Sequence, residues 1–392
     1  MADDISSSGV RTGVSVWLEG FDRALLRSGS LARLVAQSAV VGMVADATTL
    51  ADAVQESDDY TAQITELGAR GAGVDEAVEA VVAADAREAC DLLAEVFERT
   101  GGQDGVVSVG LDPRLARNTS ATIEAARRLW EAVARPNLLV QLPATLEALP
   151  VIITATAEGV GLDVTSICSL DRYRGVVNDF FTGLEQARQH GRDLSAIHSV
   201  ASIVLAPVDA EVDRLLDAVR QDGDAEAQAL RGRAAVANAV LACQVHEEVY
   251  ATPRWANLAD DGAHRQRLRW AGTTVTSSDR AGTGYVTELA TPGVVLTVRA
   301  GTLDAIAADR GVADGAADGG VADGADDSGV AVGAVPSAYE AAADVLDGLA
   351  RLGVAYPEVM DHVEDEGVSA LQASWAALRM SVSRRLDEGG LR

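Results

Sequence analysis

Short apolar runs recur along the chain, separated by amphipathic stretches. Six of these runs are rich in Val, Ile and Leu and are bounded by turn or cap residues, which is typical of buried β-strands. They predict strands at residues 14–18, 40–44, 106–111, 138–142, 161–165 and 197–205. Weaker patterns predict two further strands at residues 268–271 and 285–289.

The stretches between these runs have the spacing of amphipathic helices. They predict helices at residues 120–134, 170–190, 208–219 and 225–250. Repeated alternation of strand and helix indicates right-handed βαβ units in a parallel sheet, and eight such strands close into a barrel. The predicted fold is therefore of the α/β class, a single (β/α)8 TIM-barrel domain over residues 1–392.

The chain changes character after the last predicted strand. Residues 310–333 read RGVADGAADGGVADGADDSGVAVG, a segment so poor in large apolar residues that burial cannot offset the entropy of ordering it. We therefore predict a flexible surface loop there. Residues 337–386 return to helical patterns, which predict C-terminal helices packed on the barrel or over its mouth.

The charge and the cysteine content indicate which classes of partner the protein can bind and in which cellular compartment it works. The net charge of −27 argues against nucleic acid and anionic membrane surfaces as partners, and the partner that we expect is a small-molecule substrate. No apolar run reaches the roughly 18–20 residues needed to cross a bilayer. The three cysteines are far apart, which indicates reduced thiols, and the first residues lack a signal-peptide pattern. These features predict a cytoplasmic protein.

The cationic residues are all of one kind. Each of the 32 Lys+Arg positions is an arginine, so the chain contains no lysine. Consequently no side-chain amine is available to form an imine with a carbonyl compound.

Several segments in chain order resemble the transaldolases of the actinobacterial type. They include GVSVWLEGFDRALLRSGSLARLVAQSAVVGM, VSVGLDPRLARNT, RPNLLVQLPAT, LSAIHSVASIV, LRGRAAVANAVLA and YVTELATPGVV, spread over residues 9–305. The resemblance implies a (β/α)8 barrel with its chemistry at the C-terminal ends of the strands. It also implies a fourth-strand lysine that forms a Schiff base with a ketose phosphate, and Gln141 occupies that position. This would explain why a polar residue interrupts the apolar run 138–142: the side chain of Gln141 would point into the active site at the end of the strand.

Other positions of the resemblance carry carboxylates. Glu19 stands for an aspartate, and Asp46 and Asp163 stand for asparagines. With Gln141, these three are the catalytic candidates; Thr165, Ser166, Ser202 and Thr273 are the substrate-binding candidates. Carboxylates crowded in a low-dielectric mouth cannot all ionise cheaply, which predicts a protonated general acid or a bound cation such as Mg²⁺ or a cationic substrate. Alternatively, Asp46 caps the following helix, Asp163 is an ordinary solvated or helix-capping residue, and Gln141 forms hydrogen bonds inside an inert pocket.

Residues expected to hold phosphate or water are missing. Gly110 stands where the resemblance implies a glutamate, Pro207 where it implies a phosphate-binding arginine, and Gly272 and Thr276 where it implies a serine and a second cation. Each charge-assisted contact to phosphate is worth on the order of 1.5–3 kcal/mol, so losing two weakens a phosphosugar about a hundredfold or more. This predicts a non-standard substrate, for example a Mg²⁺-bound diphosphate.

Three functions follow as hypotheses. The first is a divergent enzyme of specialised metabolism that performs acid/base or metal-assisted lyase or cyclase chemistry without a catalytic lysine. The second is a non-catalytic relative that serves as a binding or partner protein. The third, a working transaldolase, requires an amine for its usual route. The predicted function is the first, with the second as its alternative.

Overall fold

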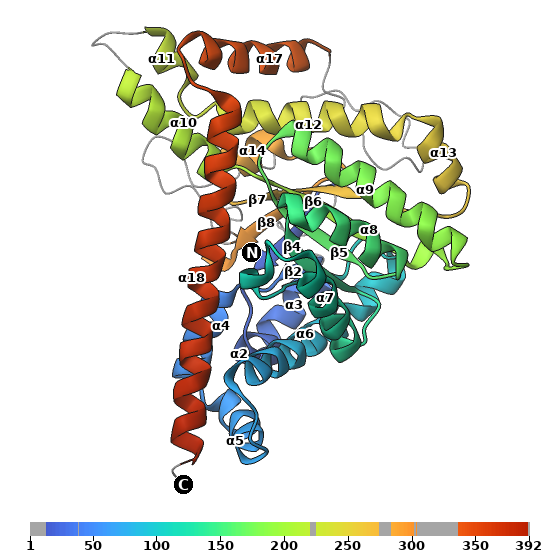
Figure 1. Ribbon diagram of the computed structural model, residues 1–392, viewed down its shortest axis with the longest axis vertical. Helices are drawn as coiled ribbons and strands as arrows, with labels where there is room; N and C mark the ends of the chain where they lie inside the picture. Colours follow the sequence, from blue (N-terminus) through green and yellow to red (C-terminus); the bar gives the residue numbers. More distant parts are fainter. Residues whose placement is uncertain are drawn as a thin grey trace.

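The computed structural model describes residues 13–37, 39–219, 225–273, 284–301, 303 and 336–390. Eight parallel strands form one closed barrel in which each strand pairs with its neighbours in chain order, and β8 closes on β1 (Figure 1). The strands are β1 (Ser15–Glu19), β2 (Gly42–Val44), β3 (Val106–Gly110), β4 (Leu138–Pro143), β5 (Leu162–Ile167), β6 (Ser199–Val204), β7 (Arg267–Ala271) and β8 (Val295–Arg299). The predicted (β/α)8 fold is confirmed.

Helices connect the strands and form the outer layer. In chain order they are α2 (Arg23–Arg27), α3 (Gly29–Ala36), α4 (Ala47–Glu56), α5 (Thr61–Ala69), α6 (Val74–Arg99), α7 (Thr119–Val133), α8 (Leu149–Ala157), α9 (Leu170–Gln189), α10 (Ala206–Val219), α11 (Ala225–Leu230), α12 (Ala234–Tyr250), α13 (Pro253–Ala259), α14 (Gly284–Leu289), α17 (Pro336–Arg351) and α18 (Tyr356–Gly390). The single helix predicted at 225–250 is divided in two, and Gly232, with φ +64°, lies in the break. The loop predicted at 310–333 lies outside the described residues.

The eighth strand was placed wrongly by the sequence pattern. Residues 285–289 belong to helix α14, and the strand is formed instead by Val295–Arg299. Gly293, with φ +87°, turns the chain just before it. The sequence of β8, VLTVR, is rich in β-branched residues, which pack well on a pleated surface. The segment YVTEL contains a β-branched pair as well, so propensity alone did not separate the two runs.

Inside the barrel, side chains are arranged in layers. An apolar cluster comes first: Trp17, Val44, Val106, Leu139, Val200 and Val295. Successive side chains on a strand point to opposite faces, so the next inward position lies two residues further on. Those positions carry Ser108, Gln141, Ser202 and Thr297, which are joined by Asp163 and Arg269 in a polar layer.

Trp17 fits inside the barrel because Gly42 faces it. A Cβ atom at Gly42 would lie 2.5 Å from Trp17 Nε1, closer than real Cβ contacts come. The ring is fully buried and lies 6.0 Å from the guanidinium carbon of Arg269. The apolar cluster and the polar layer therefore meet at the Trp17 ring.

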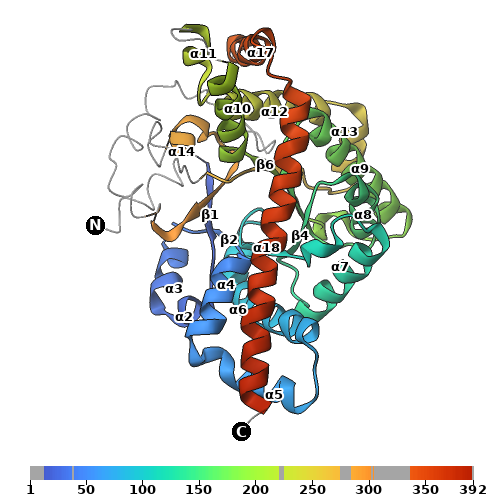
Figure 2. The same cartoon turned by 60° about the vertical axis from the view of Figure 1, so that its left-hand side comes forward.

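Helix α18 crosses the barrel from the α12–α17 end to α5 (Figures 1 and 2). It packs against α4, α5, α6 and α10. Arg385 near its C-terminal end donates to the backbone carbonyls of Val54, Gln55 and Ser57, which lack intrahelical donors at the end of α4. Arg379 pairs with Asp75 at 2.6 Å. These contacts fix the helix over the C-terminal ends of the strands.

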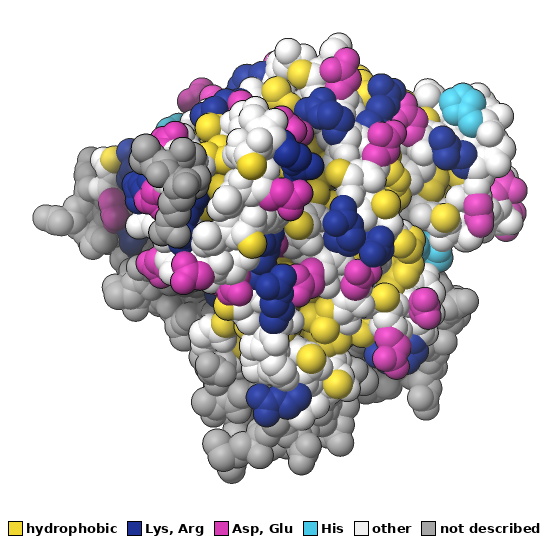
Figure 3. All heavy atoms as spheres, turned by 90° about the horizontal axis from the view of Figure 1, so that it is seen from below, with side chains coloured by type: hydrophobic (Ala, Val, Ile, Leu, Met, Phe, Trp, Pro, Cys, Tyr) yellow, Lys and Arg dark blue, Asp and Glu magenta, His cyan; other side chains and the backbone are white. Residues whose placement is uncertain are grey.

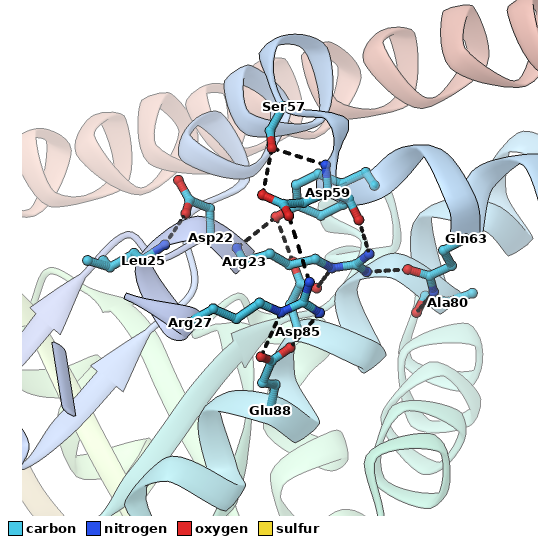
Figure 4. Close-up of polar contacts among 11 residues, drawn as sticks. Asp22, Arg23, Leu25, Arg27, Ser57, Asp59, Gln63, Ala80, Asp85 and Glu88 are labelled. Carbon is cyan, nitrogen blue, oxygen red and sulfur yellow. Dashed lines mark hydrogen bonds and ion pairs between the residues drawn. The ribbon is translucent and has the colours of Figure 1, made fainter. Parts of the chain in front are cut away.

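A buried polar cluster joins α2, α5 and α6 on one side of the barrel (Figure 4). Arg23 Nε donates to Asp85 at 2.6 Å, and the Tyr60 hydroxyl donates to the same carboxylate at 2.9 Å. Arg23 also lies over the Tyr60 ring, 4.3 Å from its centroid, and donates to Gln63 and to the Asp59 carbonyl. Burial raises the pKa of the Asp85 carboxyl, while Arg23 opposes that rise.

The surface carries interspersed charges of both signs. On the face drawn in Figure 3, arginine and acidic side chains alternate across the described surface. One pair of this kind joins Arg127 of α7 to Glu158, and the Arg127 guanidinium holds the pKa of that carboxyl below its usual range. None of the described helices is both long and apolar enough to cross a membrane.

The stability of the fold should fall in mild acid because of His198. This ring lies just before β6, stacked on His264 at 4.8 Å and edge-on to Phe97 at 5.2 Å. Burial lowers its pKa to about 4, and the positive charge of His264 adds to that effect. Since the unfolded chain binds the proton near pH 6.5, the contribution is complete above that pH and is lost as pH falls towards 4, a change of about 3 kcal/mol.

Urea unfolding at a series of pH values tests this expectation. His198→Phe keeps an aromatic ring but removes the titration, so its stability should vary less between pH 6.5 and 4 than that of the parent. The matched control is His190→Phe, at an exposed position, which should keep the parent's pH dependence. Equal pH dependence in all three proteins would refute the assignment.

Candidate functional site

A cavity of about 470 Å³ opens at the C-terminal ends of the strands, beneath α18. The strand ends give it a polar side and the helices an apolar side. Its walls include Glu19, Asp46, Gly110, Gln141, Thr165, Ser166, Arg269 and Arg299 from the barrel and Gly367, Ala370, Leu371, Ser374, Trp375 and Leu378 from α18. Cavities of roughly this size, with a few convergent polar groups, commonly bind small molecules.

The structure brings five of the eight predicted site residues to this cavity. They are Glu19, Asp46, Gln141, Thr165 and Ser166. The other three, Asp163, Ser202 and Thr273, are buried behind its wall. Ser202 belongs to the polar layer, and Thr273 donates to the carbonyl of Thr297 at 2.6 Å. Neither reaches a substrate in this arrangement.

Gln141 lies on the inward face of β4 and lines the cavity. Its Nε2 donates to Asp163 at 2.9 Å. The neighbouring inward position on β3 is Gly110, where an added Cβ would meet a single atom, Gln141 Oε1, at 3.5 Å. The amide is therefore half-buried and accessible from the cavity, as the pattern of its strand predicted.

Asp163 is held by four donors and is fully buried. Ser108 donates at 2.5 Å, Ser202 at 2.6 Å and Gln141 at 2.9 Å, and the guanidinium of Arg269 lies at 3.0 Å. Arg269 also donates to Ser202 and to Thr297. A carboxylate so completely paired supports the barrel, and its charge is already compensated.

Glu19 and Asp46 are also paired. Arg299, at the end of β8, lies 3.4 Å from Glu19 and 3.8 Å from Asp46. Asp46 also caps α4, since its carboxylate accepts from the Thr48 backbone N–H at 2.9 Å and from the Thr49 hydroxyl at 3.0 Å. The expected crowding of three uncompensated carboxylates is therefore wrong, because two arginines neutralise them separately. Within the described part of the chain, no group of three or more acidic, His or Cys side chains is placed to hold a metal ion.

Thr165 and Ser166 lie where β5 departs from regular pairing. The register with β6 shifts between Val164 and Ile167, and Ser166 has φ +57°, an uncommon conformation for a residue with a side chain. Such backbone is maintained only where its surroundings enforce it, and it is frequent at binding sites. Cys168 beyond it is buried, and burial raises its thiol pKa to about 12, which leaves it protonated.

The sequence reasoning missed Arg269, Arg299 and the wall from α18. A signal for Arg269 was present, because Arg267 and Arg269 alternate with apolar residues in β7 and so share the inward face. Arg299 was not recognised because it belongs to β8, and the eighth strand was predicted at residues 285–289 instead. Pro207 and Gly272 line the cavity where a phosphate-binding arginine and a serine were expected, and Thr276, where the second cation was expected, lies outside the described residues. Arg299 nonetheless places one exposed cation at the mouth.

Known proteins match the chain along nearly its whole length. The family model described as transaldolase/fructose-6-phosphate aldolase matches residues 16–382. A protein of Thermobifida fusca named transaldolase is 46% identical over 374 residues, which cover 95% of this chain and 96% of its own. Transaldolase 2 of Streptomyces coelicolor is 42% identical with 95% of both chains covered, and a transaldolase of an Arthrobacter species is 43% identical with 93% of both covered.

These relatives overturn the function predicted from the sequence. They are named for an ordinary transaldolase activity, which contradicts both the lyase or cyclase of specialised metabolism and its alternative, a non-catalytic partner. The inference that a chain without a catalytic lysine must have left that activity is overturned with them. The changes that suggested a new chemistry are explained by pairing, since Asp163 and Arg269 form one buried unit. The relatives indicate an enzyme, and the chain belongs to the transaldolase/fructose-6-phosphate aldolase family.

Proposed function

We propose that the protein is an enzyme that catalyses a transaldolase-type reaction on a ketose phosphate such as fructose 6-phosphate. The names of its relatives and the family description support this choice. The observation that carries it is the position of Gln141, which lines the cavity at the strand end where the resemblance places the reactive residue. Three buried free thiols agree with a reducing compartment such as the cytoplasm.

The reaction proceeds without an imine, because the chain has no lysine. The ketose carbonyl oxygen accepts a hydrogen bond from the Gln141 amide, and the nearby guanidinium of Arg269 favours negative charge on that oxygen. Glu19 takes the proton of the C4 hydroxyl as the C3–C4 bond breaks. The electron pair of that bond becomes the enediolate, and glyceraldehyde 3-phosphate leaves.

Transfer follows by the reverse steps. The enediolate carbon attacks an acceptor aldehyde, and Glu19 returns the proton to the new hydroxyl. Arg299 beside Glu19 holds the phosphate of the leaving or arriving sugar, in place of the arginine expected at Pro207. All atoms are retained between the two sugars, and no oxidant or reductant is needed.

The test is release of glyceraldehyde 3-phosphate from fructose 6-phosphate with D-glyceraldehyde as acceptor. We expect enzyme-dependent product, and a loss of about 100-fold in kcat for Gln141→Ala, the usual effect of removing one oxyanion donor. Borohydride added during turnover should give no covalent adduct. Absence of product above background would contradict the proposed reaction, and a trapped adduct in the parent would contradict its imine-free course.

A further inference from the structure

We propose that the cavity contains an apolar side pocket beneath α18, which binds an apolar substituent of a carbonyl substrate. The position of the carbonyl rests on the proposed function; the apolar pocket rests on the side chains that form it. The substrate class is an aldehyde acceptor with an alkyl or aryl group, held with its carbonyl at Gln141 and its substituent under the helix.

The apolar wall comes from three helices. The cavity is lined there by Leu50 of α4, Val82 of α6, and Leu371, Trp375 and Leu378 of α18. The polar groups gather instead at the strand ends, where Gln141 and Arg299 lie. A bare phosphosugar would occupy only the polar end. The opposite wall is therefore suited to a different part of a substrate.

Gly110 connects the polar and apolar ends. An added Cβ there would touch only Gln141 Oε1, so the space beside the strand end is open. The resemblance implies a glutamate at this position, whose side chain would project into the same space. A second cavity of about 500 Å³ between α6 and α7 shares the walls formed by Val82, Gly110, Leu111 and Trp375. The missing side chain thus leaves room for a substituent larger than a sugar hydroxyl.

Asp85, a carboxylate that lines the cavity near these helices, does not oppose an apolar ligand. Asp85 lines the cavity, but its oxygens are held by Arg23 and Tyr60 at 2.6 and 2.9 Å (Figure 4). Its side chain is 3% exposed, so a ligand entering the pocket would not remove it from water. An apolar group can therefore be buried without leaving a polar group unpaired.

The first experiment compares acceptors that differ only in chain length. With fructose 6-phosphate as donor, kcat/KM should rise about twofold to fourfold for each added methylene, or roughly 16-fold to 250-fold from propanal to heptanal. The variant Gly110→Leu fills the space beside Gly110 that connects the polar and apolar ends of the cavity. We expect its ratio of kcat/KM for heptanal to that for propanal to fall below about threefold. Equal rates for the two aldehydes in the parent would overturn the proposal.

The second experiment measures binding without turnover, so that it stands even if the proposed reaction fails. 4-Phenylbutan-1-ol is the probe, followed by calorimetry; it should bind the parent and bind Gly110→Leu at least tenfold more weakly. Gly29→Leu is the control, because it adds the same side chain where nothing lies within 4 Å, and it should bind as the parent does.

Leu371→Glu provides an independent variant should Gly110→Leu fail to fold. Leu371 is only half-buried, and a carboxylate there would repel the phenyl group without filling the space beside Gly110. We expect the same tenfold weakening of probe binding. Probe affinity that is unchanged in a folded variant of either kind, or no binding to the parent, would overturn the pocket. Probe binding without any turnover of fructose 6-phosphate would leave the pocket standing and reject the reaction.

Discussion

Asp163→Asn is expected to lower the free energy of unfolding by about 3–5 kcal/mol. The substitution restores the residue type that the resemblance implies on the fifth strand, yet it leaves the Arg269 guanidinium 3% exposed with no negative partner. The new amide NH2 also replaces one carboxylate oxygen, so it faces either Ser202, which donates to Oδ1, or Ser108 and Gln141, which donate to Oδ2. An uncompensated buried charge is among the most destabilising changes in a folded protein.

The exposed ion pair between Glu19 and Arg299 provides a control, because it separates the cost of a buried unpaired charge from the cost of losing any ion pair. Glu19→Gln also removes a carboxylate beside an arginine, but Arg299 is 58% exposed, so water compensates its charge. That control should lose no more than about 1 kcal/mol. Guanidinium unfolding followed by circular dichroism measures both variants.

The double variant Asp163→Leu with Arg269→Met tests the cause. If the penalty comes from the stranded charge, removing both charges should recover much of the loss, as replacement of buried ion pairs often does. A single variant that unfolds within about 1 kcal/mol of the parent would show that Arg269 finds water or another partner, and that the polar layer contributes little. A double variant no more stable than the single one would point to packing instead.

The fold could be predicted from the chain because alternation of strand and helix is a local property. Seven of the eight strands overlap the predicted runs, and β8 was the exception. There two β-branched segments compete within a few residues, and closure of the barrel selects the one that pairs with β1. That choice depends on a partner at the other end of the sequence, which local propensity does not record.

The candidate site was predicted only in part, for a related reason. Period-two alternation identifies inward positions such as Gln141 and Asp163, but it does not say which side chains meet across the barrel. Asp163 meets Arg269 two strands further around the wall, and Glu19 meets Arg299 where the barrel closes. Without those partners, the carboxylates looked crowded and reactive. Charge compensation is set by the closed structure, so the expectation of crowded, uncompensated carboxylates failed, although five of the eight candidate residues line the cavity.

Gln141→Lys is expected to give a covalent adduct with fructose 6-phosphate that borohydride traps, where the parent gives none. The substitution introduces the only lysine of the chain, at the inward position that lines the cavity. Its amine would replace the donor that reaches Asp163 at 2.9 Å, beside the guanidinium of Arg269. The Asp163 carboxylate favours the charged ammonium, but its charge is already compensated by Arg269; that guanidinium and partial burial both favour the neutral amine, which is the nucleophile. Intact-mass measurement after reduction should show one adduct per chain.

A lysine elsewhere distinguishes an oriented amine from a merely reactive one. Gln55→Lys places the amine on an exposed turn of α4, where we expect less than about a tenth of the labelling at the same fructose 6-phosphate concentration. Equal labelling of the two variants would mean that the cavity does not position the ketose. No adduct in Gln141→Lys would mean that the carbonyl does not reach β4, and the proposed role of Gln141 would fall with it. Strong, site-specific trapping would instead establish that the barrel retains the substrate geometry of its relatives, with an amide where they are expected to carry an amine.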